Sequence, residues 1–429
     1  MTIKKYYNQA KHQLFPICRS ITGNGVRKTL KIIKKNFSNL KIKEVPSGKK
    51  VFDWIIPPEW NINNAYVVDK YNNKIIDFKN NNLHVVNYSF PVNKKLTKKE
   101  LFEHIYSLPN KKNAIPYVTS YYKKNWGFCI THSQKTDIDK NYKNQDKFKV
   151  KIDSSFKKKG HLTYGELLLK GKSTQEILVS TYICHPSMAN NELSGSIVSM
   201  GLIDNFKKFK NLKKSIRFIF IPETIGSITY INKNWHSLKK NLIGGYNLSC
   251  IGDDREYSCM YSKYGNTQAD KALKKAFNVL KINFKTYSFL KRGSDERQYN
   301  SPGVDLPIAS VFRTKYGEYP EYHTSLDDFN VVTQKGVNGG YQVVKKAINI
   351  LLNKIIPIST ILCEPQMNKK GLYSVLGKKD KLNYIDLKNF IQYADGKNDL
   401  EAISKYIKLN IKMTKTICKI LVKHKLIRI

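Results

Sequence analysis

Beyond residue 150, short apolar runs alternate with stretches in which apolar residues recur at helical spacing. The apolar runs are EILVSTYI, IRFIFIP, NLIGGYNLSCIG and PIASVF. The helical stretches cover residues 193–206, 227–234, 269–280 and 336–355. Continuous apolar runs are typical of strands buried on both faces, and strands that alternate with helices form largely parallel sheets. We therefore predict an α/β domain.

The first part of the chain shows two other patterns. Apolar residues between 26 and 37 have helical spacing, which ends at a turn-rich PSG segment. Residues 51–132 consist of short β-branched or alternating runs that are broken by Pro, Asn and Lys. This texture predicts a β-rich domain over residues 46–140, inserted into an α/β domain formed by residues 1–45 and 141–360.

The last part of the chain contains three short helical patterns, DLKNFIQYA, LEAISKYIKL and MTKTICKILVKHKLI. Their spacing predicts a small winged helix-turn-helix domain over residues 365–429. Such domains bind DNA or mediate protein contacts and dimerisation, and this one has no Arg cluster. We expect it to serve as a scaffold or as the contact of a homo-oligomer.

The charge of the chain is strongly positive, with a formal net charge of +42 from 75 Lys and Arg against 33 Asp and Glu. Only eight of the basic residues are Arg, and the Lys residues are spread along the whole sequence. Nucleic-acid sites favour clustered Arg because its planar fork matches bases and phosphates. We therefore interpret the charge as a solvated surface and expect no nucleic-acid partner.

The seven cysteines include no Cys-x-x-Cys pair, which argues against a disulfide framework and against a zinc-thiolate knuckle. No segment approaches the roughly 20 apolar residues of a membrane span. We expect a cytoplasmic protein without a membrane partner.

Candidate chemistry lies directly after the predicted strands. His185 follows the first strand and precedes Glu192, Glu223 follows the second, and His323 follows the last. Because ligands of parallel sheets bind at the carboxyl ends of the strands, and because His and carboxylates bind Zn²⁺, these residues point to a metal site. The alternatives are a buried structural histidine at 185 and a helix-capping carboxylate at 223.

Two adjacent carboxylates, Asp253 and Asp254, follow the third strand and could bind a metal or an amine, or simply form a solvated turn. Other catalytic patterns are missing. The sequence contains no His-Glu-x-x-His, no Gly-x-Ser-x-Gly, no phosphate-binding lysine loop and no Gly-x-Gly-x-x-Gly. This argues against serine hydrolases and against nucleotide-dependent enzymes.

The order of the motifs HPSMANNELSG, FIFIPETIG, NLSCIGDD, RGSDERQY and EYPEYHTSLDD resembles the co-catalytic zinc aminopeptidase family. That family includes bacterial leucyl aminopeptidases, glutamate carboxypeptidase II and glutaminyl cyclase. Over nearly the whole chain, the sequence more closely resembles aminopeptidase-like proteins of polysaccharide-biosynthesis clusters. The resemblance implies a mixed, largely parallel sheet flanked by helices, with an inserted β-rich domain and a C-terminal winged helix.

The resemblance also implies roles for three residues: His185 as the first metal ligand, Glu223 as the general base and His323 as the final ligand. Three further ligand positions of the family differ. They are occupied by Asn191, where the family has a bridging Asp, by Thr224 instead of Glu, and by Ser249 instead of Asp. The resemblance therefore implies one zinc per chain rather than two.

We expect this zinc to be held by the two histidines and one carboxylate, from Glu192 or Asp253, with water as the fourth ligand. Tyr322 would donate to the oxyanion, and Asp295 would orient a ligand or a substrate amine. The other candidates for substrate binding are Asn191, Asp254 and Arg297.

These roles describe a zinc-dependent hydrolase of peptide or amide bonds. Its expected substrate is a small peptide or an aminoacyl or acylamino sugar of surface-polysaccharide biosynthesis. Two alternatives remain open: a glycan-pathway binding protein without hydrolytic activity on the same fold, and a DNA-binding regulator that acts through residues 365–429.

Overall fold

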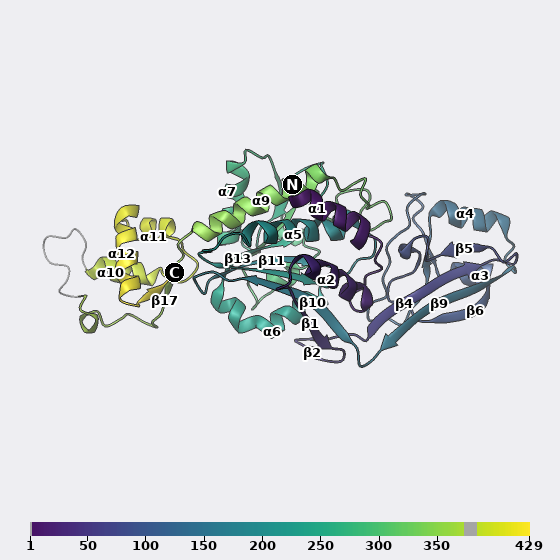
Figure 1. Ribbon diagram of the computed structural model, residues 1–429, viewed down its shortest axis with the longest axis horizontal. Helices are drawn as coiled ribbons and strands as arrows, with labels where there is room; N and C mark the ends of the chain where they lie inside the picture. The colour runs from purple at the N-terminus through teal and green to yellow at the C-terminus, as the bar shows by residue number, and fades with distance from the viewer. Residues whose placement is uncertain (1, 373–383) are drawn as a thin grey trace.

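The computed structural model describes residues 2–372 and 384–429, which form three parts in a row. A central α/β domain lies between the inserted β-rich domain at one end and the winged-helix domain at the other (Figure 1). The two outer domains are therefore far apart, and each contacts the central domain separately.

The central domain contains an eight-stranded sheet in the order β1-β10-β12-β11-β13-β16-β14-β15. The four strands predicted from apolar runs lie side by side in its middle and are all parallel. The other strands add antiparallel pairs at both sides. The bounds are β1 (Lys41–Pro46), β10 (His161–Leu169), β11 (Glu176–Tyr182), β12 (Ser215–Ile221), β13 (Leu242–Leu248), β14 (Ser258–Met260), β15 (Lys285–Tyr287) and β16 (Ile308–Phe312).

Helices cover both faces of this sheet, as the sequence predicted. The helices α1, α5, α7 and α9 lie on one face and α6 lies on the other (Figure 1). Their apolar side chains and those of the sheet form two large cores, one on each face. The helices of the domain are α1 (Thr2–Gln9), α2 (Asn24–Asn36), α5 (Ser194–Phe206), α6 (Ile225–Asn241), α7 (Gln268–Val279), α8 (Glu296–Tyr299) and α9 (Gln334–Asn353), with π-helical turns η1 (Ala10–Leu14) and η3 (Ala189–Leu193) and the 3-10 turn η4 (Phe289–Lys291).

The inserted domain is built on a four-stranded antiparallel sheet in the order β5-β4-β9-β6. Its elements are β4 (Glu59–Val68), β5 (Lys74–Asp77), η2 (Asn82–His84), β6 (Val92–Thr97), α3 (Lys98–Phe102), β7 (Ile105–Tyr106), β8 (Phe128–Cys129), α4 (His132–Asn141) and β9 (Lys147–Lys157). A short hairpin of β2 (Lys50–Val51) and β3 (Trp54–Ile55) precedes it.

The predicted end of this domain at residue 140 is wrong, because β9 is the central partner of both β4 and β6. The sequence of β9, KFKVKIDSSFK, alternates lysine with apolar residues. Its apolar side chains enter the core of the inserted domain and its lysines face outward. The many lysines made this half-buried strand hard to recognise from the sequence.

Arg27 of α2 and Glu59 of β4 join the inserted domain to the central domain by a two-pronged ion pair. The Arg27 Nη1 and Nη2 atoms donate to the two Glu59 carboxylate oxygens at 2.9 and 2.5 Å. The backbone N–H of His161 donates to the same carboxylate at 3.1 Å. Burial opposes ionisation, but these hydrogen bonds lower the pKa of Glu59 from 4.5 to about 2.

We expect Glu59→Gln to lower the free energy of unfolding by about 2 kcal/mol at neutral pH, because the bidentate charge-assisted contact is lost. The pKa of Glu59 is lowered on folding, so its contribution is present above pH 4.5 and is lost as the pH falls towards 2. Urea titrations of both proteins at several pH values should therefore converge at low pH. A difference that persists unchanged in acid would contradict this role.

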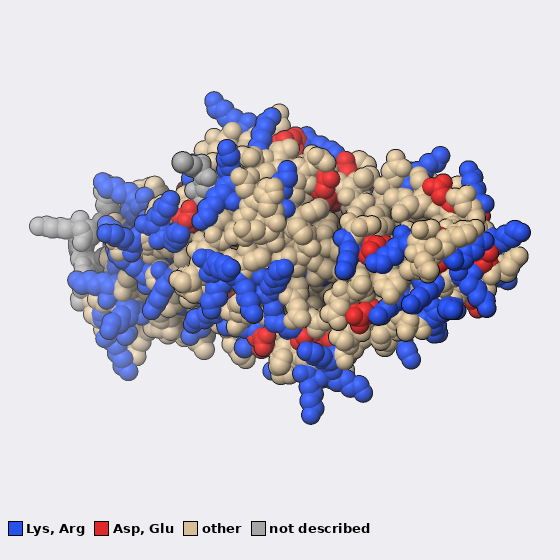
Figure 2. Space-filling view, turned by 45° about the vertical axis from the view of Figure 1, so that its right-hand side comes forward, with Lys and Arg blue, Asp and Glu red and all other residues tan. Residues whose placement is uncertain are grey.

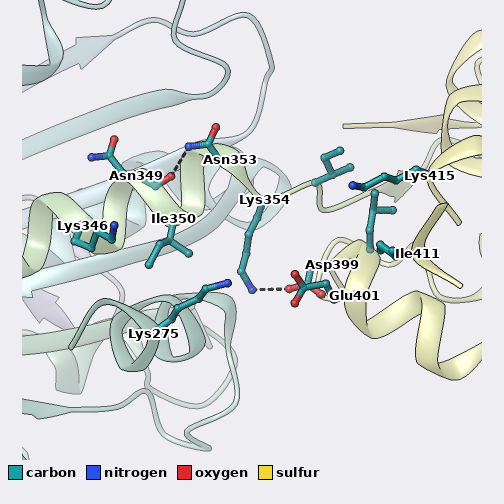
Figure 3. A pocket seen from close by; sticks show the side chains of 12 residues that line it. Lys275, Lys346, Asn349, Ile350, Asn353, Lys354, Asp399, Glu401, Ile411 and Lys415 are labelled. Atoms are coloured by element: carbon teal, nitrogen blue, oxygen red, sulfur yellow. Dashed lines mark hydrogen bonds and ion pairs between the residues drawn. The ribbon is translucent and has the colours of Figure 1, made fainter. Parts of the chain in front are cut away.

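The C-terminal domain has its own apolar core and consists of β17 (Ile358–Ser359), η5 (Asn368–Lys370), α10 (Tyr384–Gln392), α11 (Leu400–Tyr406), α12 (Ile411–Lys423) and β18 (Ile427–Arg428). β17 pairs with β18, so the domain begins before the predicted residue 365. Residues 373–383 of the predicted segment lie outside the described residues. At the junction with α9, the Lys354 ammonium group contacts Asp399 at 2.5 Å beside a pocket of about 440 Å³ (Figure 3).

Lys and Arg side chains are spread over the face shown in Figure 2, across all three parts of the molecule. All seven cysteines are free. Within residues 2–372 and 384–429, no helix combines the length and the apolar character that crossing a bilayer requires.

Candidate active site

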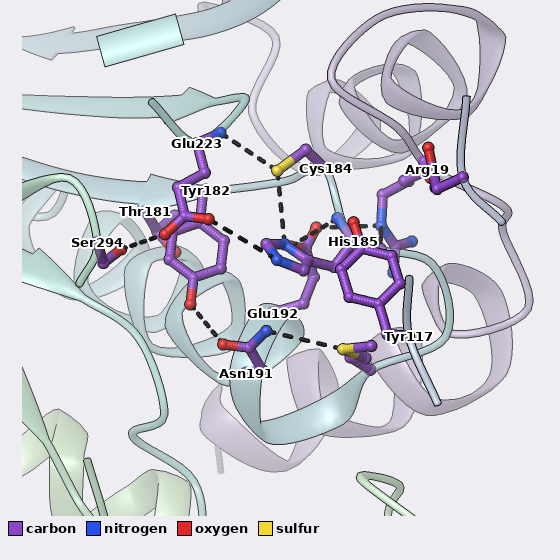
Figure 4. A network of polar contacts seen from close by, with 12 residues as sticks. Arg19, Tyr117, Thr181, Tyr182, Cys184, His185, Asn191, Glu192, Glu223 and Ser294 are labelled. Carbon is purple, nitrogen blue, oxygen red and sulfur yellow. Dashed lines mark hydrogen bonds and ion pairs between the residues drawn. The ribbon is translucent and has the colours of Figure 1, made fainter. Parts of the chain in front are cut away.

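Three residues predicted from the sequence meet at the carboxyl ends of the central strands. His185 follows β11, Glu223 follows the neighbouring strand β12, and His323 lies in the loop beyond β16. The Nε2 atom of His185 lies 3.8 Å from the nearer carboxylate oxygen of Glu223. The centroids of the two imidazole rings are 5.5 Å apart. The parallel arrangement thus brings together side chains that are up to 138 residues apart in the sequence. Figure 4 shows two of them, His185 and Glu223.

Glu192 fixes the orientation of the His185 ring. Its Oε2 atom lies 3.1 Å from His185 Nδ1 and accepts the backbone N–H of the same residue at 3.0 Å. A carboxylate at Nδ1 places the proton there, so the lone pair of the neutral ring is at Nε2 and faces Glu223. Burial opposes protonation of His185, but Glu192 raises its pKa above the usual value.

Arg19 completes this arrangement and was not anticipated from the sequence. Its buried guanidinium donates from Nε to Glu192 Oε1 at 3.1 Å and to the carbonyl of His185 at 2.9 Å. Its Nη1 atom donates to the carbonyl of Leu14 at 2.6 Å. Both oxygens of Glu192 are therefore engaged, one by Arg19 and one by His185. The one sequence feature that could have indicated a buried Arg is its position within the apolar stretch FPICRSI.

One carboxylate oxygen of Glu223 accepts a hydrogen bond, and the other faces His185. The Ser294 hydroxyl donates to its Oε1 atom at 2.6 Å (Figure 4). The backbone N–H of Glu223 points to the sulfur of Cys184 at 3.2 Å. Burial raises the pKa of Glu223, while His185 and Ser294 oppose this shift. Ser294 was not predicted as a site residue.

The turn after Glu223 is fixed by two predicted substrate-binding residues. Thr224 has a positive φ of 63°, which is uncommon for a residue with a branched side chain. Asp295 accepts its N–H at 2.7 Å, and the Arg297 guanidinium donates to its hydroxyl at 2.9 Å. Burial and the nearby Glu223 raise the pKa of Asp295 to about 7. These contacts hold the turn at Thr224, while the contact of Asp295 and Arg297 with substrate stays a prediction.

The opposite wall of the site is aromatic. The Tyr322 ring stacks on His323 with centroids 3.9 Å apart. The ring of Tyr117, in the inserted domain, is tilted against the ring of His185, with centroids 5.1 Å apart. It meets the ring of His323 edge to face, with centroids 5.2 Å apart. Burial and the neighbouring His185 lower the pKa of His323 to about 3, so this ring is uncharged at neutral pH. Tyr117 could not be found from the sequence, because the inserted domain carries no motif that points to the histidines.

The remaining candidates stabilise loops around the site. Asn191, at the predicted substrate position, accepts the Tyr182 hydroxyl at 2.7 Å. Asp253 is buried and accepts hydrogen bonds from Asn190, from the backbone N–H and hydroxyl of Thr314, and from the backbone N–H of Arg255. The exposed Asp254 accepts the Thr333 hydroxyl at 2.5 Å. The predicted roles of Asp253 as a metal ligand and of Asp254 as a substrate contact therefore have no support in the structure.

The donor atoms do not fit the two-metal centre of the zinc aminopeptidases, because Asn191, Thr224 and Ser249 supply no ionised oxygen. Among the described residues, the one group of three metal-ligating side chains within 4.8 Å is Cys184, His185 and Glu192. Glu192 is already engaged, and burial raises the pKa of the Cys184 thiol far above its usual value, which disfavours the thiolate that zinc requires.

The two imidazoles, with ring centroids 5.5 Å apart, offer nitrogen donors of the kind that a single ion would take. His185 presents the lone pair of Nε2, and the ring of His323 is uncharged and therefore able to donate to a metal. Glu192 then acts behind His185, as carboxylates commonly do behind the histidine ligands of zinc. The predicted third ligand from Glu192 or Asp253 is not assembled in the structure.

The sheet order, the helices on both faces and the residues at the strand ends define an aminopeptidase-like α/β protein with a winged-helix domain. The chain belongs to the family described as domain of unknown function DUF4910, which matches residues 7–354. A winged helix-turn-helix family matches residues 356–429. A Clostridium acetobutylicum protein is 42% identical over 391 residues, which cover 90% of this chain and 88% of that protein. Its provisional name is polysaccharide biosynthesis protein with aminopeptidase-like domain.

Solved structures confirm the fold that the sequence motifs implied. A crystal structure of a C. acetobutylicum protein, provisionally described as a peptidase, has a TM-score of 0.79 at 39% identity and covers 100% of this chain and 96% of that one. The zinc aminopeptidase BSAP of Bacillus subtilis has a TM-score of 0.60 at 14% identity, with coverage of 81% and 93%. A peptidase M28 precursor of Shewanella amazonensis has a TM-score of 0.53 at 11% identity, with coverage of 85% and 97%. The last two likenesses show the fold alone.

Proposed function

We propose that this protein is a zinc-dependent hydrolase of amide bonds, with an acylamino or aminoacyl sugar as substrate. The observation that carries the proposal is the partly buried Glu223 carboxylate, which faces the oriented Nε2 atom of His185 in the fold of zinc aminopeptidases. The provisional name of the C. acetobutylicum relative supports a role in polysaccharide biosynthesis. The seven free cysteines support a cytoplasmic location.

His185 and His323 would hold the zinc ion. When bound, zinc polarises a carbonyl group and makes a water molecule a stronger nucleophile at neutral pH. Glu192 and Arg19 keep the His185 ring in the tautomer that binds metal.

Side chains of the protein carry out the proton transfers and stabilise the oxyanion. Glu223 accepts the proton of the attacking water at its Oε2 atom and returns it to the nitrogen of the leaving amine. Burial raises the pKa of Glu223, which makes it a stronger base. Ser294 holds the other carboxylate oxygen, and Tyr322 lies against His323, where its hydroxyl can donate to the oxyanion.

A substrate screen tests this function. Purified protein loaded with zinc would be incubated with aminoacyl amides, dipeptides, N-acylated amino sugars and aminoacyl sugars, and the release of amine would be followed by mass spectrometry. We expect turnover of an acylamino or aminoacyl sugar. Turnover of peptides alone would retain the hydrolase and reject the sugar substrate, and no turnover of any class would reject both.

We expect about one zinc per chain after purification without chelators. His185→Ala and His323→Ala should each lose most of it, because each removes one of the two imidazole donors. His236→Ala, which removes an exposed histidine of α6, serves as the matched control and should keep the zinc. Elemental analysis by mass spectrometry, with circular dichroism to check folding, decides the outcome. Two tightly held ions, or unchanged zinc in the His185→Ala variant, would contradict the proposed site.

The replaced carboxylates favour one alternative, a glycan-pathway binding protein that does not hydrolyse its ligand. The resemblance to the zinc aminopeptidases implies that Asn191, Thr224 and Ser249 occupy positions of ionised ligands in that family. Calorimetry would detect binding of a sugar that is not consumed, and the absence of zinc from the purified protein would favour this alternative further.

A further inference from the structure

The inserted domain reaches the candidate active site through the loop between β7 and β8, which covers residues 107–127. The backbone of this loop pairs with the segment that carries His323. The Tyr117 N–H donates to the His323 carbonyl at 2.9 Å, and the Ile115 carbonyl accepts the Ser325 N–H at 2.8 Å. The Ser325 hydroxyl in turn accepts the Ile115 N–H at 3.0 Å. The two segments thus form a short antiparallel bridge between the domains.

The other end of the His323 segment is anchored within the central domain. Asp327 is fully buried, and its carboxylate accepts the backbone N–H groups of Asn190 at 2.6 Å and of Asn191 at 2.9 Å. The same carboxylate accepts the Tyr319 hydroxyl at 2.9 Å. His323 therefore lies between a fixed part of the central domain and the bridge to the inserted domain.

The backbone of His323 itself has an uncommon conformation, with a positive φ of 54°. Residues other than glycine seldom adopt such a φ, and they keep it where the surrounding structure holds them. The hydrogen bond from the Tyr117 N–H is made to the carbonyl of this residue. The contact with the inserted domain thus acts directly on the backbone that directs the imidazole.

Side-chain contacts hold the imidazole as well. The ring centroids of Tyr117, His185 and His323 lie 5.1, 5.2 and 5.5 Å apart in pairs, so the three rings form a nearly equilateral triangle. The Tyr117 ring meets His323 edge to face, while Tyr322 stacks on it, and both geometries are favourable for aromatic rings. The hydroxyl groups of Tyr117 and Tyr121 lie 2.9 Å apart and form a hydrogen bond, which fixes the Tyr117 ring.

We propose that Tyr117 is a positioning residue of the candidate active site, which holds the His323 imidazole in the place from which it binds zinc. The role of His323 as a ligand rests on the proposed function, and the inference goes beyond that function by making the inserted domain a working part of the site. The Tyr117 hydroxyl is engaged by Tyr121, so Tyr117 acts through His323. Both Tyr117 and His323 are partly exposed, so the contact borders space that a ligand can enter.

Chemical labelling of His323 in the zinc-free, full-length protein tests this inference without any activity. Diethyl pyrocarbonate modifies accessible imidazole nitrogen atoms, and mass spectrometry of the digested protein gives the rate at each histidine. Tyr117→Leu keeps an apolar side chain but removes the ring, so the rate at His323 should rise severalfold. The rate at the exposed His236 is the internal reference and should not change.

Zinc affinity provides the second readout. Tyr117→Leu should lower it about tenfold, as is typical when a residue that orients a metal ligand is lost. Tyr117→Phe keeps the ring and should restore both the affinity and the slow labelling of His323. Tyr71→Leu makes the same change at a tyrosine of the inserted domain that is 68% exposed, and this matched control should behave like the parent. Competition with a chromophoric zinc indicator measures the affinities, and circular dichroism checks folding.

Ser325→Ala is a second variant that leaves every aromatic ring in place. It removes the hydroxyl that accepts the Ile115 N–H and so weakens the bridge between the two segments. The labelling of His323 should therefore rise in this variant too, by less than in Tyr117→Leu. This variant decides the outcome if Tyr117→Leu does not fold.

The two readouts separate this inference from the proposed function. Labelling of His323 at the parent's rate in both Tyr117→Leu and Ser325→Ala would overturn the inference, even if Tyr117→Leu had a lower thermal midpoint, because Tyr117 would then only pack. Equal zinc affinity in the parent and in Tyr117→Leu would also overturn it and would leave the zinc site intact. A parent that binds no zinc would reject the proposed function, while faster labelling in Tyr117→Leu would still establish that Tyr117 positions His323.

Discussion

Glu223→Gln is expected to reduce turnover by about 10²–10⁴-fold and to leave zinc content and sugar affinity unchanged. Glutamine keeps the shape of the side chain and the oxygen that accepts the Ser294 hydroxyl. It cannot take up a proton at neutral pH, so the attacking water loses its base. The effect should fall on kcat, because the base acts in the transition state and contributes little to binding.

The measurement compares initial rates over a range of substrate concentrations, with zinc determined on the same samples. Glu103→Gln makes the same chemical change at an exposed position of the inserted domain and should retain full activity. An equally active Glu223→Gln would show that another group is the base. A loss confined to KM would instead make Glu223 a substrate contact.

Arg19→Met is expected to destabilise the protein by about 3–5 kcal/mol, because it leaves the Glu192 carboxylate buried without its cationic partner. Both side chains are fully buried, and the guanidinium also donates hydrogen bonds to the backbone carbonyls of Leu14 and His185. The thermal midpoint should fall by on the order of 10 °C. Zinc affinity should fall as well, because Glu192 would no longer be held behind His185.

The double variant Arg19→Met/Glu192→Gln separates charge from packing. Removing both charges should recover part of the lost stability, since the unpaired carboxylate is then gone. Differential scanning calorimetry of both variants and the parent gives the coupling between the two residues. If Arg19→Met alone were as stable as the parent, the buried ion pair would have no structural role.

The central strands and the proximity of the three main residues of the candidate site could be predicted from the sequence. The runs EILVSTYI and IRFIFIP are continuously apolar because β11 and β12 are covered on both faces by helices. Parallel neighbours end at the same edge of a sheet, so the residues that follow them meet, and His185 and Glu223 do so at 3.8 Å.

The boundaries of the inserted domain were harder to predict. Strand β9 is buried on one face only, and lysines occupy much of its outer face. Its sequence therefore lacks the continuous run of apolar residues that marks a central strand. Its pairing with β4 across about 90 residues of sequence depends on contacts between distant segments, which no local pattern records.

The roles of the acidic residues were also decided by contacts between distant segments. Asp253 and Asp295 both lie within motifs that resemble those of zinc aminopeptidases, yet Asp253 is enclosed by donors from three segments and Asp295 holds the turn at Thr224. Residue type and spacing show which groups are able to bind a metal. Only the surrounding hydrogen bonds show which of them remain free to do so.

The sequence by itself determined the α/β architecture, the winged helix and the edge of the sheet at which His185, Glu223 and His323 lie. These features follow from local periodicity and from the general geometry of parallel sheets. Only the tertiary structure decided that Arg19 pairs with Glu192 and that Tyr117 of the inserted domain covers both imidazoles. These contacts join segments up to 206 residues apart, and their energy comes from burial and partner geometry, which the order of residues along the chain does not contain.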